Sequence, residues 1–231
     1  MPNSHFEILA NEMTPLGVLC LRRRELLSQP GTIVTEVTLN DEFLMSSLHT
    51  DSERALARTA MQMHAGADLR VLIGGLRLGY TAREVILSER VANVEVVELL
   101  PQVIGWLKND LVPLSRELQN DRRLVITQGD VFRRLRGPAD DLFDVILIDV
   151  DQSPDDGLDE ESVSFYTVPG LQAARRHLWA EGLLAVWSYV ESSPFTDAIR
   201  AVFKQVRVEQ VSHHNRLVDQ RCTGWLFFAR G

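Results

Sequence analysis

The chain has 231 residues, which at roughly 150 residues per domain corresponds to one large domain or to one domain with a small appendage. Hydrophobic residues make up 45% of the sequence, enough for a chain of this length to form a core without covalent cross-links. Lysine and arginine number 24 against 32 aspartates and glutamates, and the net charge of −8 is spread along the chain. This balance argues against a nucleic-acid partner, because phosphate binding needs clustered cations.

The number of cysteines and the lengths of the apolar runs bear on the cellular compartment of the protein. Cys20 and Cys222 lie near opposite ends of the chain in no metal-ligand spacing, so the sequence suggests neither a disulfide framework nor a metal site. No apolar run approaches the roughly 18 residues of a membrane span, and the first residues lack the order of a signal peptide. We therefore expect a cytoplasmic protein with no membrane partner.

The first 48 residues are predicted to form a small β appendage. Two strand-like runs, 17–21 and 32–39, flank a Gln-Pro-Gly turn at 29–31, a pattern that predicts a β-hairpin. Thr50 and Glu53 then have the spacing of a capping box. Apolar residues at helical spacing follow and predict an amphipathic helix over 51–64.

From residue 69 onward, strand patterns alternate with helix patterns, which is typical of a parallel sheet with crossover helices. Strands are predicted at 71–73, 94–98, 124–127, 145–149 and 183–189. The last two runs, 206–211 and 225–229, have no helix between them and predict an antiparallel hairpin at the sheet edge. The expected fold is α/β: a doubly wound, mostly parallel, Rossmann-like sheet in a domain of residues 49–231, preceded by the β-hairpin appendage of residues 1–48.

A glycine-containing loop, Gly74-Gly75-Leu76-Arg77-Leu78-Gly79, joins the first strand of this domain to a helix. Thr81 and Glu84 have the capping-box spacing at the start of that helix, where a ligand can approach backbone N–H groups. The loop departs from the dinucleotide-binding fingerprint, because no glycine lies between Gly75 and Gly79. On its own it fits a plain tight turn better than a nucleotide site.

Four acidic residues follow three consecutive strands. Glu98 ends the second strand, close to the roughly 20-residue distance from the loop at which a carboxylate reaches a ribose. Asp130 follows the third strand, and Asp149 and Asp151 follow the fourth. Each acid alone could be a helix cap or a turn former. Together at the carboxyl edge of a parallel sheet they predict a nucleoside-binding crevice.

This ordered set of motifs resembles the spermidine synthase group within the class I S-adenosylmethionine-dependent methyltransferase superfamily. The matching stretches are 71–75 with Gly79, 83–85, 94–98, 129–130, 143–149, 165–166 and 181–186. The resemblance implies that Glu98, with Leu99 beside it, holds the ribose hydroxyls and that Asp130 and Val131 hold the adenine. It also implies that Gly74, Gly75, Leu76, Arg77 and Gly79 hold the amino-acid part of the cofactor, and that Asp149 binds the reacting amine.

The sequence departs from the family at the acceptor side of the site. Family members that transfer an aminopropyl group usually carry Gly-Gly-Gly-Asp-Gly-Gly in the loop. That aspartate binds the amine of the aminopropyl group, and Arg77 stands in its place. Two like unit charges 4 Å apart repel each other by about 4 kcal/mol at an effective dielectric near 20, so Arg77 disfavours an amine at this position. Arg77 could instead pair with the carboxylate of S-adenosylmethionine, or it could point into solvent. Met45, Ser46 and Ser47 replace a Tyr-His-Glu stretch of the family.

We therefore expect an enzyme that uses S-adenosylmethionine, or its decarboxylated form, to alkylate a small-molecule acceptor. Asp149 or Asp151 would be the general base. The charge of Arg77 favours methyl transfer, and aminopropyl transfer is the alternative. A nucleoside-binding module without catalytic activity is the alternative of another class. The sequence does not identify the acceptor. It is compatible with a homodimer.

Overall fold

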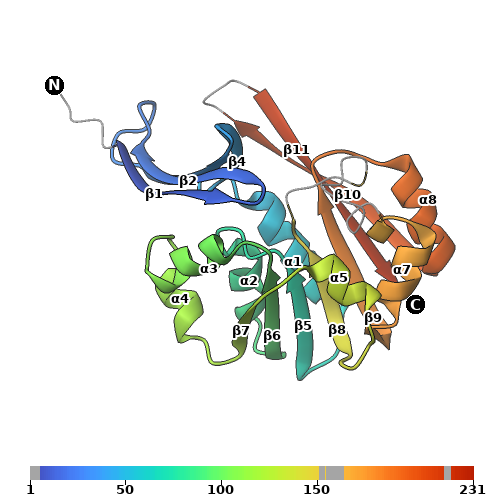
Figure 1. Ribbon diagram of the computed structural model, residues 1–231. Helices are drawn as coiled ribbons and strands as arrows, with labels where there is room; N and C mark the ends of the chain where they lie inside the picture. Colours follow the sequence, from blue (N-terminus) through green and yellow to red (C-terminus); the bar gives the residue numbers. More distant parts are fainter. Residues whose placement is uncertain (1–5, 151–153, 155–163, 216–219) are drawn as a thin grey trace.

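The computed structural model describes residues 6–150, 154, 164–215 and 220–231. Its main feature is a seven-stranded sheet with the strand order β10-β11-β9-β8-β5-β6-β7 (Figure 1). The strands are β5 Leu69–Gly74, β6 Val91–Glu98, β7 Leu124–Gln128, β8 Phe143–Ile148, β9 Leu178–Ser188, β10 Gln205–Asn215 and β11 Gln220–Arg230. Strands β5 to β9 are parallel to one another, whereas β11 is antiparallel to both β9 and β10. The predicted parallel sheet with a terminal hairpin at its edge is confirmed.

Helices cover both faces of this sheet, as a doubly wound fold requires. One face packs against α1 Asp51–Met63, α2 Tyr80–Ile86, α3 Pro101–Lys108 and α4 Ser115–Asn120, and the other against α5 Val131–Arg136, α7 Val168–Arg175 and α8 Ser193–Val202. The central strands β5 and β8 are buried along nearly their whole length, which explains their continuous apolar sequences. In the part of the chain that the structure describes, no helix has the length and apolarity needed to cross a membrane.

The N-terminal region is larger than the predicted hairpin. It is a four-stranded antiparallel sheet in the order β1-β2-β3-β4, with β1 Phe6–Thr14, β2 Gly17–Glu25, β3 Ile33–Leu39 and β4 Glu42–Ser46 (blue in Figure 1). Strands β2 and β3 are the predicted pair. Strand β1 was missed because most of it is exposed and its sequence lacks a clear apolar alternation.

One hydrophobic core joins the two sheets. Leu19 and Leu21 of β2 and Val37 of β3 belong to the same buried cluster as Leu56 of α1 and Val71 of β5. The small sheet is therefore packed onto the α/β part through apolar side chains. The division of the chain into domains 1–48 and 49–231 stays a prediction.

Both predicted capping boxes are wrong. Thr50 makes no side-chain cap on α1, and its hydroxyl instead accepts a hydrogen bond from Arg54 Nε at 3.0 Å. Gly79 is the N-cap of α2, and the Thr81 hydroxyl instead donates to the Asp149 carboxylate. The side chain of Glu53 accepts a hydrogen bond from Ser52. Thr81 and Glu53 belong to the site described below.

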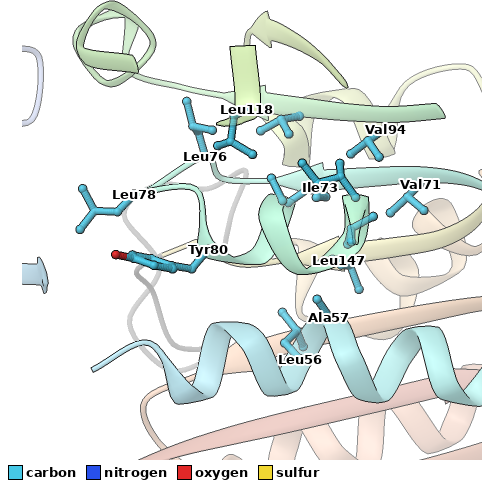
Figure 2. Packing of buried hydrophobic residues seen from close by; sticks show 14 of the residues in the cluster. Leu56, Ala57, Val71, Ile73, Leu76, Leu78, Tyr80, Val94, Leu118 and Leu147 are labelled. Atoms are coloured by element: carbon cyan, nitrogen blue, oxygen red, sulfur yellow. The ribbon is translucent and has the colours of Figure 1, made fainter. Parts of the chain in front are cut away.

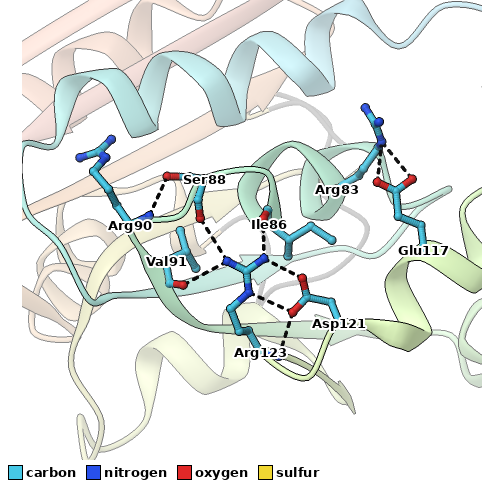
Figure 3. Close-up of polar contacts among 8 residues, drawn as sticks. All are labelled: Arg83, Ile86, Ser88, Arg90, Val91, Glu117, Asp121 and Arg123. Atoms are coloured by element: carbon cyan, nitrogen blue, oxygen red, sulfur yellow. Dashed lines mark hydrogen bonds and ion pairs between the residues drawn. The ribbon is translucent and has the colours of Figure 1, made fainter.

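A network of polar contacts fixes the helix that follows the glycine loop. Arg123 donates to the backbone carbonyls of Ile86, Ser88 and Val91 and pairs with Asp121, which ties β7 to the segment between α2 and β6 (Figure 3). On the same helix, Arg83 Nε lies 3.0 Å from the Glu117 carboxylate of α4 (Figure 3). Helix α2 is thus held at its C-terminal end by Arg123 and against α4 by Arg83 of its last turn.

Candidate functional site

A pocket opens at the carboxyl edge of the sheet, where the strand order reverses. The chain passes from β5 to β6 on one side, while β8 lies on the other side of β5, and such switch points are where ligands bind in open α/β sheets. The pocket encloses about 260 Å³. Its lining comes from Gly75, Arg77, Val97, Glu98, Leu99, Leu100, Val103, Gly129, Asp130, Val131, Phe132, Asp149 and Val150, together with Leu16, Leu19, Leu39, Leu44 and Met45 of the small sheet.

Close packing explains two glycines of the loop. Gly75 has φ +94°, and a Cβ atom there would lie 2.2 Å from the backbone oxygen of Asp149. Its N–H donates to the Val97 carbonyl at 2.9 Å, so the loop passes tightly between β6 and β8. Gly79 has φ +90°, and a Cβ atom there would lie 2.4 Å from Leu118 Cδ1. A side chain at either position would push the loop out of place.

The other loop residues support the pocket from behind. Leu76 and Leu78, which replace glycines of the family, are buried in the core cluster that also holds Leu56 and Leu118 (Figure 2). Gly74 packs under Val131, whose Cγ1 would lie 2.7 Å from a Cβ atom at position 74. Of the predicted loop ligands, Gly75 and Arg77 line the pocket, whereas Gly74, Leu76 and Gly79 do not.

Glu98 is a buried carboxylate at the end of β6. Its side chain accepts hydrogen bonds from the backbone N–H groups of Leu76 and Leu100, each at 2.8 Å, and the residue is only 7% exposed. Burial raises the pKa of Glu98, and hydrogen bonds from backbone N–H groups, led by those of Leu100 and Leu76, oppose that rise. The carboxylate is therefore fixed in orientation at the wall of the pocket, where hydroxyl groups of a ligand can donate to it.

Asp130 lies at the other side of the pocket and has two roles. Its Oδ1 atom accepts the N–H groups of Phe132 at 2.8 Å and Arg133 at 3.3 Å, so it is the N-cap of α5. It also lines the pocket, together with Val131 and the half-exposed Leu99. Asp130 is thus a helix cap that also lies at the pocket, and its contact with an adenine stays a prediction.

Asp149 and Arg77 form the centre of a buried polar cluster. Asp149 is 1% exposed, and its two carboxylate oxygens accept hydrogen bonds from the Thr81 hydroxyl and from Arg77 Nη1, the latter at 3.2 Å. Arg77 Nη2 lies 3.8 Å from Glu53 Oε1 of α1. The guanidinium carbon lies 5.0 Å from the ring centroid of Trp187, a cation–π contact.

This cluster corrects one expectation for Arg77. Its side chain is 10% exposed, so it does not point into solvent. Its backbone adopts φ +52°, a left-handed conformation that is uncommon for a residue other than glycine. The charge of the guanidinium is matched inside the protein by Asp149 and Glu53.

Sequence reasoning missed part of this arrangement. The sequence analysis assigned Glu53 and Thr81 to helix caps, and local sequence gives no signal for their contacts with Arg77 or Asp149. The apolar wall that the small sheet adds to the pocket was missed as well. Asp151 lies outside the described residues, so its role as a base stays a prediction.

Comparison with known proteins gives sequence relatives for about half of the chain. No protein-family model matches it. A segment covering 57% of the chain is 34% identical to polyamine aminopropyltransferase 2 of Streptomyces coelicolor, of which it spans 23%. A segment covering 52% of the chain is 35% identical to a polyamine aminopropyltransferase of Ruegeria sp., of which it spans 42%. The chain thus matches less than half the length of each relative.

Two solved structures resemble the whole fold. One is a spermidine synthase in complex with the transition-state analogue AdoDATO, with a TM-score of 0.75, 20% identity, and coverage of 96% of this chain and 73% of that one. The other is the spermidine synthase of Thermotoga maritima, with a TM-score of 0.73, 20% identity, and coverage of 96% and 72%. These relatives and structures support the aminopropyl alternative, and they do not support the methyl transfer that the sequence favoured. These comparisons confirm that the chain has the fold of the spermidine synthases and that about half of it is similar in sequence to polyamine aminopropyltransferases.

Proposed function

We propose that the chain binds decarboxylated S-adenosylmethionine in the pocket at the switch point and transfers its aminopropyl group to a small-molecule nucleophile. The observation that carries this proposal is Glu98, a buried carboxylate that lines the pocket at the end of the second parallel strand. The names of the sequence relatives favour the aminopropyl group over the methyl group.

The residues of the pocket fit an adenosyl group. Glu98 offers fixed carboxylate oxygens to the two ribose hydroxyls, which are hydrogen-bond donors. Asp130 and Val131 would hold the adenine between the start of α5 and the end of β7. The space beside Gly129, where the nearest atom to an added Cβ would be Val97 Cγ1 at 3.5 Å, leaves room for a flat ring.

Asp149 would assist the transfer itself. The bound sulfonium supplies a carbon atom that is already activated, so the chain has to align the acceptor and remove a proton. The acceptor nitrogen forms a bond to the aminopropyl carbon next to the sulfur while the bond between that carbon and the sulfur breaks, and 5′-methylthioadenosine leaves. The proton released by the nitrogen passes to a base at the strand end, for which Asp149 is the candidate within the described residues.

The structure removes the argument for methyl transfer that rested on charge. That argument treated Arg77 as a cation available to the carboxylate of S-adenosylmethionine. Its guanidinium instead has Asp149 and Glu53 as partners. A cation already paired with two carboxylates discriminates weakly between a cofactor tail that carries a carboxylate and one that lacks it.

Calorimetry and mass spectrometry test the proposal. We expect 5′-methylthioadenosine to bind and Glu98→Ala to weaken that binding. We expect a panel of acceptors incubated with decarboxylated S-adenosylmethionine to give at least one product that has gained an aminopropyl group. Gain of a methyl group from S-adenosylmethionine would contradict the aminopropyl assignment. Nucleoside binding without turnover of any acceptor would favour the binding module, and absence of nucleoside binding would exclude both.

A further inference from the structure

Two carboxylates and an aromatic face surround one position next to the pocket. Asp149 comes from the end of β8, Glu53 from the first turn of α1, and Trp187 from the end of β9. Carboxylates provide charge-assisted hydrogen bonds to an ammonium group, and an indole face attracts a cation. Together these groups have the chemistry of a receptor for an organic cation.

The protein's own guanidinium occupies this position. Arg77 lies 3.2 Å from the Asp149 carboxylate, 3.8 Å from that of Glu53 and 5.0 Å from the Trp187 ring centroid. The side chains of Asp149 and Glu53 are only 2% and 9% exposed, so solvent screens their pairing with Arg77 poorly. Since Thr81 donates to the second oxygen of Asp149, each of the two carboxylate oxygens has a partner from the chain.

We infer that Arg77 is a specificity-determining residue that fills the cation position between Asp149, Glu53 and Trp187, and so keeps linear diamines and polyamines out of the acceptor site. This inference rests on the proposed function for the existence of an acceptor, and it narrows the acceptor's chemical class. The acceptor presents no second ammonium group to Asp149.

The rest of the pocket agrees with such an acceptor. The small sheet contributes Leu19, Leu39, Leu44 and Met45 to the pocket wall, and none of these side chains can bind a cation. A diamine entering the pocket would find Asp149 and Glu53 already paired with Arg77. A molecule with one nucleophilic group on an apolar body would instead pack against this wall.

Binding of 1,4-diaminobutane to Arg77→Ala and to the unsubstituted protein tests the inference. We expect the variant to bind the diamine at least about tenfold more tightly, because the two carboxylates that pair with Arg77 become available to the diamine. Arg116→Ala is the matched control, since Arg116 is 86% exposed and pairs only with Asp110 within the described residues. It should bind the diamine no better than the unsubstituted protein. The affinity for the uncharged 1,4-butanediol should be the same in all three proteins.

Loss of Arg77 also leaves buried charges unpaired and lowers stability, so a second measurement is needed. We expect 1,4-diaminobutane to raise the melting temperature of Arg77→Ala and of Arg77→Gln with increasing concentration, and to leave that of the unsubstituted protein unchanged. Equal diamine binding by the unsubstituted protein and Arg77→Ala would overturn the inference. So would the absence of both binding and thermal stabilisation in the two Arg77 variants.

The diamine titration is run with and without 5′-methylthioadenosine. Tighter diamine binding by Arg77→Ala in a protein that does not bind the nucleoside would refute the proposed function and leave the role of Arg77 standing. Nucleoside binding with no difference between the proteins toward the diamine would refute the role of Arg77 alone.

Discussion

Replacement of Gly75 by alanine should damage the site through a steric conflict that can be worked out from the structure. At φ +94° an alanine is strained, by about 1–2 kcal/mol for an L-residue in a left-handed conformation. Its Cβ atom would also lie 2.2 Å from the backbone oxygen of Asp149, so the loop or the end of β8 must move by about 1 Å. Overpacking of this kind costs about 1–3 kcal/mol. The total expected loss is about 2–5 kcal/mol.

Two other glycines separate these contributions. Gly31 has φ +86° but no atom within 4 Å of an added Cβ, so Gly31→Ala should lose only the conformational part, about 1–2 kcal/mol. Gly105 lies inside α3 with open space around it, so Gly105→Ala should gain about 0.5–1 kcal/mol from helix propensity. The difference between Gly75→Ala and Gly31→Ala measures the close approach of the loop to Asp149.

Urea unfolding measures the stability of the three variants, and their transition midpoints can be compared where the dependence of the unfolding free energy on urea concentration is the same. For a chain of this length, each 1 kcal/mol should also move the melting temperature by about 2–4 °C. Gly75→Ala should in addition weaken 5′-methylthioadenosine binding, because the displaced loop lines the pocket. If Gly75→Ala and Gly31→Ala lose the same stability, the loop does not pass against Asp149 and the site geometry is wrong.

Three further predictions concern the two buried acids. Glu98→Ala should weaken 5′-methylthioadenosine binding by about 1–3 kcal/mol in calorimetry, because the ribose hydroxyls lose their acceptor, and unchanged affinity would remove that role. Protonation of Glu98 should also weaken nucleoside binding. Burial raises the pKa of Glu98, so nucleoside affinity should start to fall, as the pH is lowered, at a pH above the usual titration range of a glutamate. The affinity of Glu98→Gln should not show this pH dependence. Asp149→Asn should lower turnover far more than nucleoside affinity; a rate close to that of the unsubstituted enzyme would assign the proton transfer to another group.

The sequence alone predicted the main sheet and the place of the pocket. Its apolar runs are continuous because the strands of a doubly wound sheet are buried on both faces, so they can be recognised locally. The acids at 98, 130 and 149 predicted the crevice because parallel strands end at one edge of the sheet. The structure places all three at the same pocket.

Only the tertiary structure decided what the polar side chains near Arg77 do. A threonine followed by a glutamate three residues later has the same sequence whether the side chains cap a helix or turn away to distant partners. Thr81 and Glu53 do the latter, because packing of α1 against α2, β8 and β9 brings them beside Asp149 and Arg77. A buried carboxylate must be paired, but its partner can lie anywhere along the chain. Asp149 and Arg77 are 72 residues apart in sequence, so only the fold could show that the arginine's charge is matched inside the protein.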